Sequence, residues 1–447
     1  MFNILDFGAV SGGEILCRDA FQKAVDACHA AGGGTVFVPG GTYLMGTVFL
    51  KDNVHIFLDA GALLLGSRDL KNHFAPDEEF PYPVYQDVSH TFFHHSLFVG
   101  ENLKNISITG SGKIDMQSKY ESDDFTPVRG VGICGKGSYR GAKVIGFKEC
   151  TNVILKDFSL FNATDLAIAL AGCEDIRVSG LLIDTHIDGI NIDCCKNTVI
   201  SDCIIRSGDD GIVPKSSYVL GRKQLTENLV VTNCILSSES NAIKLGTESN
   251  GGFKNVTVSN CVITDTRAAG LSVEAIDGGD VNGITFTNIT MRNVACPFFV
   301  IIGDRARGPE GTGIGTIKNV SISHIICTGP FDLIPIKRCP YWPELEYLPT
   351  NSKQGGMIVG LPDHPVENVR LEDIYLQVDG GVDTPVEFVP ENPKAYPEPY
   401  IFGTLSSYGL FIRHAKNVKA VDIKAEVIHP DVRPEITLDD VENFVRV

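Results

Sequence analysis

One short phrase recurs along this chain: an asparagine or aspartate, followed by alternating positions rich in β-branched residues. In the central part it begins at Asp175, Asn197, Asn228 and Asn255, so consecutive copies start about 22 to 31 residues apart. Further copies begin at Asn105, Asn152, Asn319, Asn368 and Asn417. A period of this size is typical of a solenoid, in which each repeat forms one coil and contacts only its neighbours. We therefore expect residues 1–447 to form a single solenoid domain.

The alternation within each phrase has a period of two, as in Asn255-Val256-Thr257-Val258. This period and the many valines and isoleucines predict β-strands. Strands of successive coils would lie parallel and about 4.8 Å apart, which makes the expected fold an all-β parallel β-helix. The leading asparagine suits a corner between strands, because asparagine tolerates left-handed backbone geometry and hydrogen-bonds locally. A stack of such asparagines would satisfy polar groups along the corner.

An amphipathic helix is expected near the N-terminus, from Asp19 to Ala31, with apolar residues at i, i+3, i+4 and i+7. The glycines 32–34 would end it. Because a solenoid must cover its open end, we expect residues 1–60 to form an N-terminal cap with the first coils. The rival solenoid, a leucine-rich repeat, would need a Leu-x-x-Leu-x-Leu spacing that this sequence lacks.

Composition excludes several classes of partner. The formal net charge of −17 argues against binding to nucleic acid or to anionic membranes. The sequence has no apolar run long enough for a transmembrane helix, and its first residues lack the basic and apolar regions of a secretory signal, so we expect a cytoplasmic protein. The 13 cysteines have no zinc-type spacing, and we expect them to be buried and reduced. We expect no metal and no other cofactor, and a homo-oligomer stays open.

Acidic residues gather at one corner of two consecutive coils. Asp188 lies in the first coil, Asp209 and Asp210 lie in the second, and Asp188 and Asp210 are both followed by Gly-Ile. A single Asp-Gly pair is usually no more than a turn. Three aspartates in adjacent coils favour a functional site over that reading.

The coil spacing brings these residues into register. The same offset of 13 residues leads from Asp175 to Asp188, from Asn197 to Asp210 and from Asn228 to Asn241. Residues with one offset should stack at one position of the coil, and Asp209 should project from the same corner at a different angle.

Stacked aspartates repel one another, so their pKa values should be driven apart. Hydrolysis of a glycosidic bond needs this split, because a carboxylic acid protonates the leaving oxygen while a carboxylate activates water. A single-step inverting mechanism requires carboxyl groups about 6.5–9.5 Å apart, a distance that neighbouring coils can span.

The segment from Asp188 to Lys215, with its Gly208-Asp209-Asp210 motif, resembles glycoside hydrolase family 28, the polygalacturonase family. The opening stretch 6–43 and the segment 246–252 are also similar to that family, and the resemblance runs from about residue 2 to about residue 425. It implies a right-handed parallel β-helix and inverting hydrolysis. It also implies that Asp209 is the general acid, and that Asp188 and Asp210 hold and activate the water.

Other positions depart from the family pattern. His186 replaces the asparagine of the Asn-x-Asp motif, and Asn241 stands where the family has the histidine of a Gly-His-Gly segment. The family's Arg-Ile-Lys segment, whose two cations would hold a uronate carboxylate, aligns with Ser272-Val273-Glu274. A standard polygalacturonase activity is therefore not what we expect.

Several side chains are candidates to replace those contacts. Lys215 and Lys244 would supply positive charge, and Lys244 falls near the coil position of Ser272; each lysine would otherwise be solvated or paired. Arg305 would clamp a carboxylate or form a salt bridge within its loop. The full set of candidate substrate-binding residues is His186, Lys215, Glu239, Asn241, Lys244, Glu248, Glu274 and Arg305. The three glutamates would hydrogen-bond sugar hydroxyls or lie on a polar surface.

Three long segments interrupt the repeat, at about 68–86, 118–142 and 330–356. Loops of this length are usually functional or disordered. The third contains Tyr341 and Trp342, which would either stack on a sugar ring or anchor the loop.

Our first hypothesis is an exo-acting inverting glycoside hydrolase whose substrate is a pectin-derived or related plant-cell-wall oligosaccharide. The alternatives are a polysaccharide lyase on the same fold, which would need a calcium site and a basic residue, and a non-catalytic carbohydrate-binding β-helix.

Overall fold

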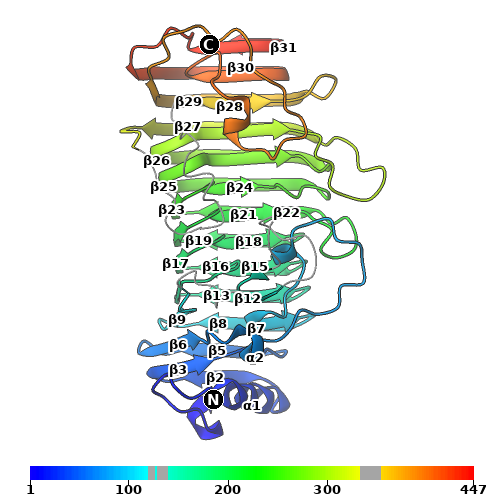
Figure 1. Cartoon of the computed structure of the whole chain (residues 1–447), viewed down its shortest axis with the longest axis vertical. Helices are drawn as coiled ribbons and strands as arrows, with labels where there is room; N and C mark the ends of the chain where they lie inside the picture. The colour runs from blue at the N-terminus through cyan, green and yellow to red at the C-terminus, as the bar shows by residue number, and fades with distance from the viewer. Residues whose placement is uncertain (119–125, 128–138, 333–353) are drawn as a thin grey trace. The chain divides into compact units, whose positions relative to one another are not determined.

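The computed structural model describes residues 1–118, 126–127, 139–332 and 354–447, with the backbone alone for 126–127 and 139–140. Strands dominate these ranges, and the two α-helices found in them are α1 (Arg18–Ala30) and α2 (Leu70–His73). The chain divides into two compact units, one of residues 1–207 and 219–222 and one of residues 208–218 and 223–447. Each unit is built from parallel strands stacked coil upon coil, which is the predicted all-β parallel β-helix (Figure 1).

The first unit has three parallel sheets, and a complete coil contributes one strand to each. The first sheet stacks β1 (Phe2–Asn3), β2 (Gly34–Val38), β5 (Val54–Leu58), β8 (Lys104–Thr109), β13 (Thr151–Lys156), β16 (Glu174–Ser179) and β19 (Lys196–Ser201). The second stacks β3 (Gly41–Met45), β6 (Ala62–Gly66), β9 (Lys113–Asp115), β14 (Ser159–Phe161), β17 (Leu182–Thr185) and β20 (Ile204–Ser207). The third stacks β4 (Val48–Phe49), β7 (Ser96–Glu101), β12 (Lys143–Lys148), β15 (Ile168–Ala171) and β18 (Ile190–Asp193). Outside the sheets lie η1 (Ile4–Phe7), η2 (Val88–His90) and the short antiparallel pair β10 (Thr126–Pro127) and β11 (Tyr139–Arg140).

The second unit repeats this plan with longer strands that pass through more than one sheet. Its first two sheets are formed by β22 (Thr226–Thr232), β23 (Ile235–Ser238), β25 (Phe253–Ala275), β26 (Asp280–Ile302), β27 (Thr316–Thr328), β29 (Val366–Gly380) and β30 (Leu410–His429). Its third sheet stacks β21 (Ile212–Lys215), β24 (Ile243–Leu245), the C-terminal ends of β25 and β26, β28 (Gly356–Val359), the start of β30 and β31 (Ile436–Arg446).

The predicted asparagine stack is present at a corner near the start of the strands of the first sheet. Most of its members have positive φ, for example 57° at Asn152 and 59° at Asn319. In several coils the side-chain amide donates to the side chain of the coil before, as Asn368 does to Asn319 over 3.1 Å. Asn282 also belongs to this stack, because it accepts from Asn319 over 2.9 Å. The coil that begins at Asn282 was not identified from the repeated phrase in the sequence.

Helix α1 begins and ends one residue earlier than predicted. It packs against β1, β2, β4 and β5, the first coils of the first unit. Phe21 lies at its buried face, with its ring centroid 5.8 Å from that of Phe98. The helix therefore covers apolar side chains of the first unit, as a capping helix should.

Eleven cysteines of the described ranges are buried thiols, as predicted. Within those ranges, no helix combines the length and the apolar character needed to cross a membrane.

The outer face of the third sheet of the second unit is polar in its first coils and apolar further along. On β24, Ile243 and Leu245 are buried inside the coil, and strand alternation turns Lys244 to the outer face. The next coils change this face from polar to apolar, since Phe299 and Met357 belong to a buried cluster that includes Val389 and Phe402.

Val389 and Phe402 come from the segment between β29 and β30, which we call the strap (residues 381–409). It contains the short 3-10 helix η5 (Pro399–Phe402). The strap covers the outer apolar face of the third sheet and so brings its own polar residues toward Lys244.

Candidate active site

Asp209 and Asp210 lie immediately before β21, in the second unit. The coil register predicted for Asp210 and Asn241 is confirmed, because Ile212 and Ile243, each two residues further on, are strand partners. The backbone N–H of Asn241 donates to Oδ1 of Asp210 over 3.0 Å, and its side-chain amide donates to the same oxygen over 2.9 Å. One oxygen of the Asp210 carboxylate is thus held by two hydrogen bonds from the next coil.

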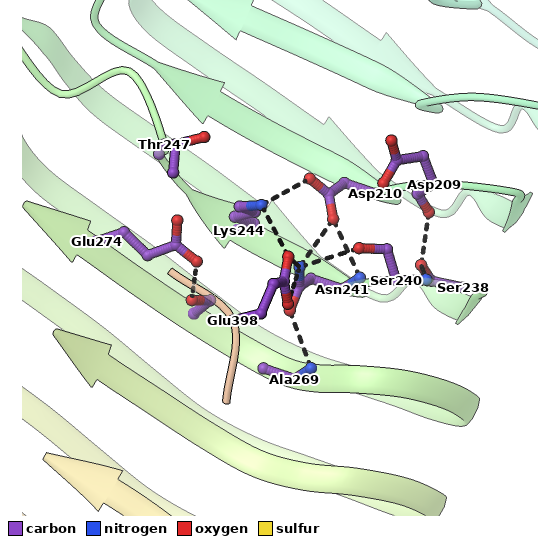
Figure 2. Close-up of polar contacts among 12 residues, drawn as sticks. Asp209, Asp210, Ser238, Ser240, Asn241, Lys244, Thr247, Ala269, Glu274 and Glu398 are labelled. Atoms are coloured by element: carbon purple, nitrogen blue, oxygen red, sulfur yellow. Dashed lines mark hydrogen bonds and ion pairs between the residues drawn. The ribbon is translucent and has the colours of Figure 1, made fainter. Parts of the chain in front are cut away.

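The other carboxylate oxygen of Asp210 faces Lys244, whose Nζ lies 3.2 Å away (Figure 2). Both residues are almost completely buried, with 5% of Asp210 and 1% of Lys244 exposed. Burial alone would raise the pKa of Asp210, but the Lys244 ammonium and the Asn241 amide outweigh it and hold this pKa below its usual value. Asp210 is therefore kept ionised.

Lys244 was expected near the coil position of Ser272, and the two residues are strand partners in β24 and β25. Its ammonium also lies 3.4 Å from Oε1 of Glu398, which comes from the strap. Burial would lower the pKa of Lys244, but the surrounding acidic groups, Asp210 first, raise it well above its usual value. The lysine stays charged and acts as the shared counter-ion of this cluster.

Asn241 joins three chain segments. Its amide nitrogen lies 3.2 Å from Oε1 of Glu398, and its amide oxygen accepts from the backbone N–H of Ala269 over 2.9 Å. The amide thus orients Asp210 from the position where the family resemblance leads one to expect histidine. Its predicted contact with substrate stays a prediction.

Glu274 lies beside this cluster on the outer face of β25 and has no exposed surface. Its Oε1 accepts from the hydroxyl of Ser272 over 2.6 Å. Burial raises the pKa of Glu274 to about 8, although Lys244 partly opposes the shift. Burial also raises the pKa of Glu398. One lysine cannot neutralise three carboxylates, so the pKa of Asp210 stays low while the pKa values of the two glutamates are raised.

A second charged group lies at the ends of the same strands. Lys215 binds Glu248, with 2.8 Å between Nζ and Oε2. Arg305 makes two hydrogen bonds to the carboxylate of Asp277, one of them 2.9 Å long from Nε. Arg305 therefore forms a salt bridge, but its partner Asp277 lies in the preceding coil and not in the loop of Arg305. Its role as a substrate clamp stays a prediction. Because these carboxylates already hold cations, a metal ion would have to compete with Lys215 and Arg305 for them.

Asp209 keeps part of its surface exposed, unlike Asp210. Its backbone carbonyl accepts from the hydroxyl of Ser238 over 2.6 Å, which fixes the turn. Glu239, one residue further along that coil, is 8% exposed.

Asp188 and His186 lie in the first unit, just after β17. Asp188 is buried, His186 is half-buried, and the backbone carbonyl of Asp188 accepts from Ala167 over 3.0 Å. The gathering of Asp188 with Asp209 and Asp210 stays a prediction from the sequence register. In the same unit, Lys143 and Asp165 form a buried ion pair of 2.9 Å that the sequence reasoning missed.

The sequence reasoning also missed Tyr396 and Glu398. Both lie on the strap, whose five prolines and the 49-residue step from Asn368 to Asn417 were the available signals. Tyr341 and Trp342, for which the sequence leaves open either stacking on a sugar or anchoring of the loop, lie outside the described residues.

The chain is similar to known proteins in sequence and in structure. Residues 71–329 match the model of the family "Glycosyl hydrolases family 28". A probable polygalacturonase of Vitis vinifera is 30% identical over 316 residues, which cover 67% of this chain and 62% of the relative. An exo-poly-alpha-D-galacturonosidase of Dickeya chrysanthemi is 26% identical over 347 residues, which cover 66% of this chain and 56% of the relative. The chain therefore spans less than two thirds of the length of either relative.

Among solved structures, an exopolygalacturonase from Thermotoga maritima superposes with a TM-score of 0.65 at 21% identity, covering 84% of this chain and 86% of its own. That likeness supports the right-handed parallel β-helix fold. The family model covers more than half of the chain. The chain belongs to glycosyl hydrolases family 28.

Proposed function

We propose that this protein is an inverting glycoside hydrolase that acts on pectin-derived oligosaccharides. The observation that carries the proposal is the state of Asp210, a buried carboxylate that Lys244 and Asn241 keep ionised. A general base must be a carboxylate at the working pH, and a buried one is normally protonated unless its surroundings are arranged against that.

Asp209 is the proposed general acid. It donates its proton to the glycosidic oxygen as the bond from the anomeric carbon to that oxygen breaks. A water attacks the anomeric carbon from the opposite face and passes a proton to Asp210. Asp188, assigned by its position in the coil, shares in holding this water. The products are two shorter sugars, and the configuration at the anomeric carbon is inverted.

We further propose exo action, with release of a short product from a chain end. The support is the similarity to the exo-poly-alpha-D-galacturonosidase of Dickeya chrysanthemi. We do not propose homogalacturonan in its free-acid form as the preferred substrate. The cations Lys244 and Arg305 are already bound to carboxylates of the protein.

The test is a panel of oligosaccharides incubated with the purified protein, with the products separated by size. The panel contains homogalacturonan oligomers, as free acids and as methyl esters, and rhamnogalacturonan oligomers. We expect at least one to be shortened stepwise, and Asp209→Asn to reduce that rate at least a hundredfold. Asp422→Asn, an exposed aspartate at a corner of β30, is the matched control and should leave the rate unchanged. If no member of the panel is cleaved, or if Asp209→Asn cleaves as fast as the wild type, the proposal is wrong.

A further inference from the structure

The strap is anchored firmly by buried contacts. Phe402 is almost completely buried, and its ring meets that of Phe299 with 6.3 Å between centroids. The guanidinium of Arg413 on β30 donates to the backbone carbonyls of Val389 and Pro390 over 3.0 and 3.1 Å. A segment held at several points by core packing and by charge-assisted hydrogen bonds presents its remaining residues in fixed positions.

One of these remaining residues, Glu398, ties the strap to the candidate active site. Its carboxylate contacts the side-chain amide of Asn241 at 3.2 Å and the ammonium of Lys244 at 3.4 Å. These are the two residues that orient the carboxylate of Asp210. The strap is therefore part of the polar cluster around Asp210 (Figure 2).

Tyr396, two residues before Glu398, is held at its hydroxyl and still lies at the surface. The hydroxyl oxygen lies 3.3 Å from Nζ of Lys244 and 3.4 Å from the hydroxyl of Thr247. The Lys244 ammonium lies 5.0 Å from the ring centroid, and the guanidinium carbon of Arg305 lies 5.7 Å from it. Despite these contacts, 45% of the residue is exposed.

An aromatic ring fixed in this way is poorly explained as packing alone. Leaving apolar ring surface in water forgoes the stabilisation that burial would give, which is about 25 cal/mol per Å². The neighbouring Phe402 obtains that stabilisation by inserting into the apolar cluster. Tyr396 instead leaves 45% of its surface exposed. Its hydroxyl oxygen lies 3.3 Å from Nζ of Lys244, the lysine that neutralises Asp210.

We propose that Tyr396 forms a sugar-binding subsite, in which a pyranose ring of the substrate stacks its apolar C–H face on the exposed tyrosine ring. The cations near the ring orient it, and the hydroxyl contacts prevent it from rotating away. Because a rigid aromatic side chain loses little conformational entropy on binding, it is well suited to holding a sugar. This inference rests on the proposed function and adds a binding residue and a ligand class to it.

The ligand class is a sugar residue without a free carboxylate. Lys244 lies within 3.4 Å of the carboxylates of Asp210 and Glu398, and Arg305 binds Asp277 through two nitrogens. A uronate would have to compete with these protein carboxylates for both cations. A neutral sugar, or a uronate whose carboxyl group is methyl-esterified, meets no such competition.

The test measures binding separately from cleavage. Asp209→Asn protein is titrated by calorimetry with trigalacturonide, once as the methyl ester and once as the free acid. We expect the ester to bind more tightly, and we expect Tyr396→Ala, added to Asp209→Asn, to weaken its binding about tenfold or more. Tyr396→Phe and Tyr396→Trp keep an aromatic platform and should stay within about threefold of the parent. These expectations correspond to a stacking contribution of about 1.4 kcal/mol or more for the ring.

Tyr375 on β29 supplies a matched control. Its hydroxyl donates to Glu426 over 2.8 Å, and Lys424 lies 5.7 Å from its ring centroid, so its contacts resemble those of Tyr396. Tyr375 does not belong to the third sheet, which carries Lys244 and is covered by the strap. Tyr375→Ala should leave oligosaccharide binding unchanged. The proposed stacking would be refuted if Tyr396→Ala bound the oligosaccharide as tightly as its parent. It would also be refuted if Tyr396→Phe lost as much affinity as Tyr396→Ala.

The remaining outcomes are also decisive. Tighter binding of the free acid than of the ester would refute the uncharged ligand class, and a failure of both to bind would refute the subsite. If the wild type cleaved none of the oligosaccharides in the panel but binding still depended on Tyr396, the hydrolase proposal would be refuted. The proposed sugar-binding subsite would then still be supported.

Discussion

The ammonium nitrogen of Lys244 lies 3.2 Å from a carboxylate oxygen of Asp210, and both side chains are removed from water. A buried ion pair gains its net stability only when further hydrogen bonds satisfy its members. Asn241 supplies these to Asp210, and Glu398 and Tyr396 contact Lys244. The charge state of the proposed base therefore depends on groups from two other parts of the chain, the next coil and the strap.

Lys244→Met tests this dependence. Asp210 has a lowered pKa in the folded protein, so activity that needs its carboxylate is present at higher pH and is lost as the pH falls through that pKa. Removing the ammonium raises the pKa, so the acidic limb of the pH–rate profile should move to higher pH. The free energy of unfolding should fall by about 3–5 kcal/mol, because the carboxylate is left without its partner. Lys419→Met, at an exposed lysine of β30, should change neither quantity. An unmoved acidic limb in a folded Lys244→Met protein would contradict the assignment of Asp210 as the base.

Glu274→Gln should change how stability depends on pH. Burial raises the pKa of Glu274 from 4.5 to about 8, so between these values the folded protein holds a proton that the unfolded chain has lost. Stability from this group is therefore greatest below about pH 4.5 and declines as the pH rises toward 8, by at most about 1.4 kcal/mol per pH unit. Glutamine keeps an oxygen for the Ser272 hydroxyl but does not titrate. The free energy of unfolding of both proteins should be measured with urea between pH 5 and 9. We expect the free energy of the variant to rise relative to that of the wild type up to about pH 8. An equal pH dependence of the two free energies would refute the raised pKa.

Asp209→Asn should be sensitive to the leaving group. A general acid contributes about 10²–10⁴-fold to the rate, and it does so by protonating a poor leaving group. The rate on an oligosaccharide should therefore fall by at least a hundredfold, while an aryl glycoside of the same sugar, whose phenolate leaves without protonation, should lose much less. Initial rates on both substrates provide the measurement. Equal losses on the two would remove Asp209 from the role of the acid.

Asn319→Gly and Asn319→Ala separate two contributions of the asparagine stack to stability, the side-chain hydrogen bonds and the left-handed backbone conformation. Glycine accepts the φ of 59° at this corner without strain, but it cannot donate to Asn282 or accept from Asn368. Asn319→Ala loses the same hydrogen bonds and adds backbone strain. We expect the glycine variant to lose about 1–2 kcal/mol of unfolding free energy, and the alanine variant to lose about 1 kcal/mol more. Chemical denaturation measures both, and a glycine variant as stable as the wild type would mean that the stacked amides contribute nothing.

The sequence predicted the fold well because a solenoid repeats one local rule. Each coil brings the same alternation and the same corner asparagine, so errors at one coil do not propagate. The coil that begins at Asn282 was missed without consequence for the fold. The register of Asp210 with Asn241, and of Lys244 with Ser272, followed from counting along coils of similar length.

The sequence could not predict what reaches the site from outside the repeat. Glu398 contacts Asn241 across 157 positions of the chain, and this contact depends on how the strap packs on Phe299 and Met357. Long-range packing of an irregular segment leaves no periodic signal. For the same reason the partners of Lys215 and Arg305 were open from the sequence, and only the structure assigned them to Glu248 and Asp277.

The anomeric configuration of the first product tests whether hydrolysis proceeds by a single inverting displacement. Proton NMR should be recorded within the first minutes of cleavage, before mutarotation mixes the two anomers. Attack of a water that Asp210 activates, with Asp209 as the acid, predicts a product whose new anomeric centre has the configuration opposite to that of the bond cleaved. A product that keeps the original configuration would require a covalent intermediate and would contradict the mechanism.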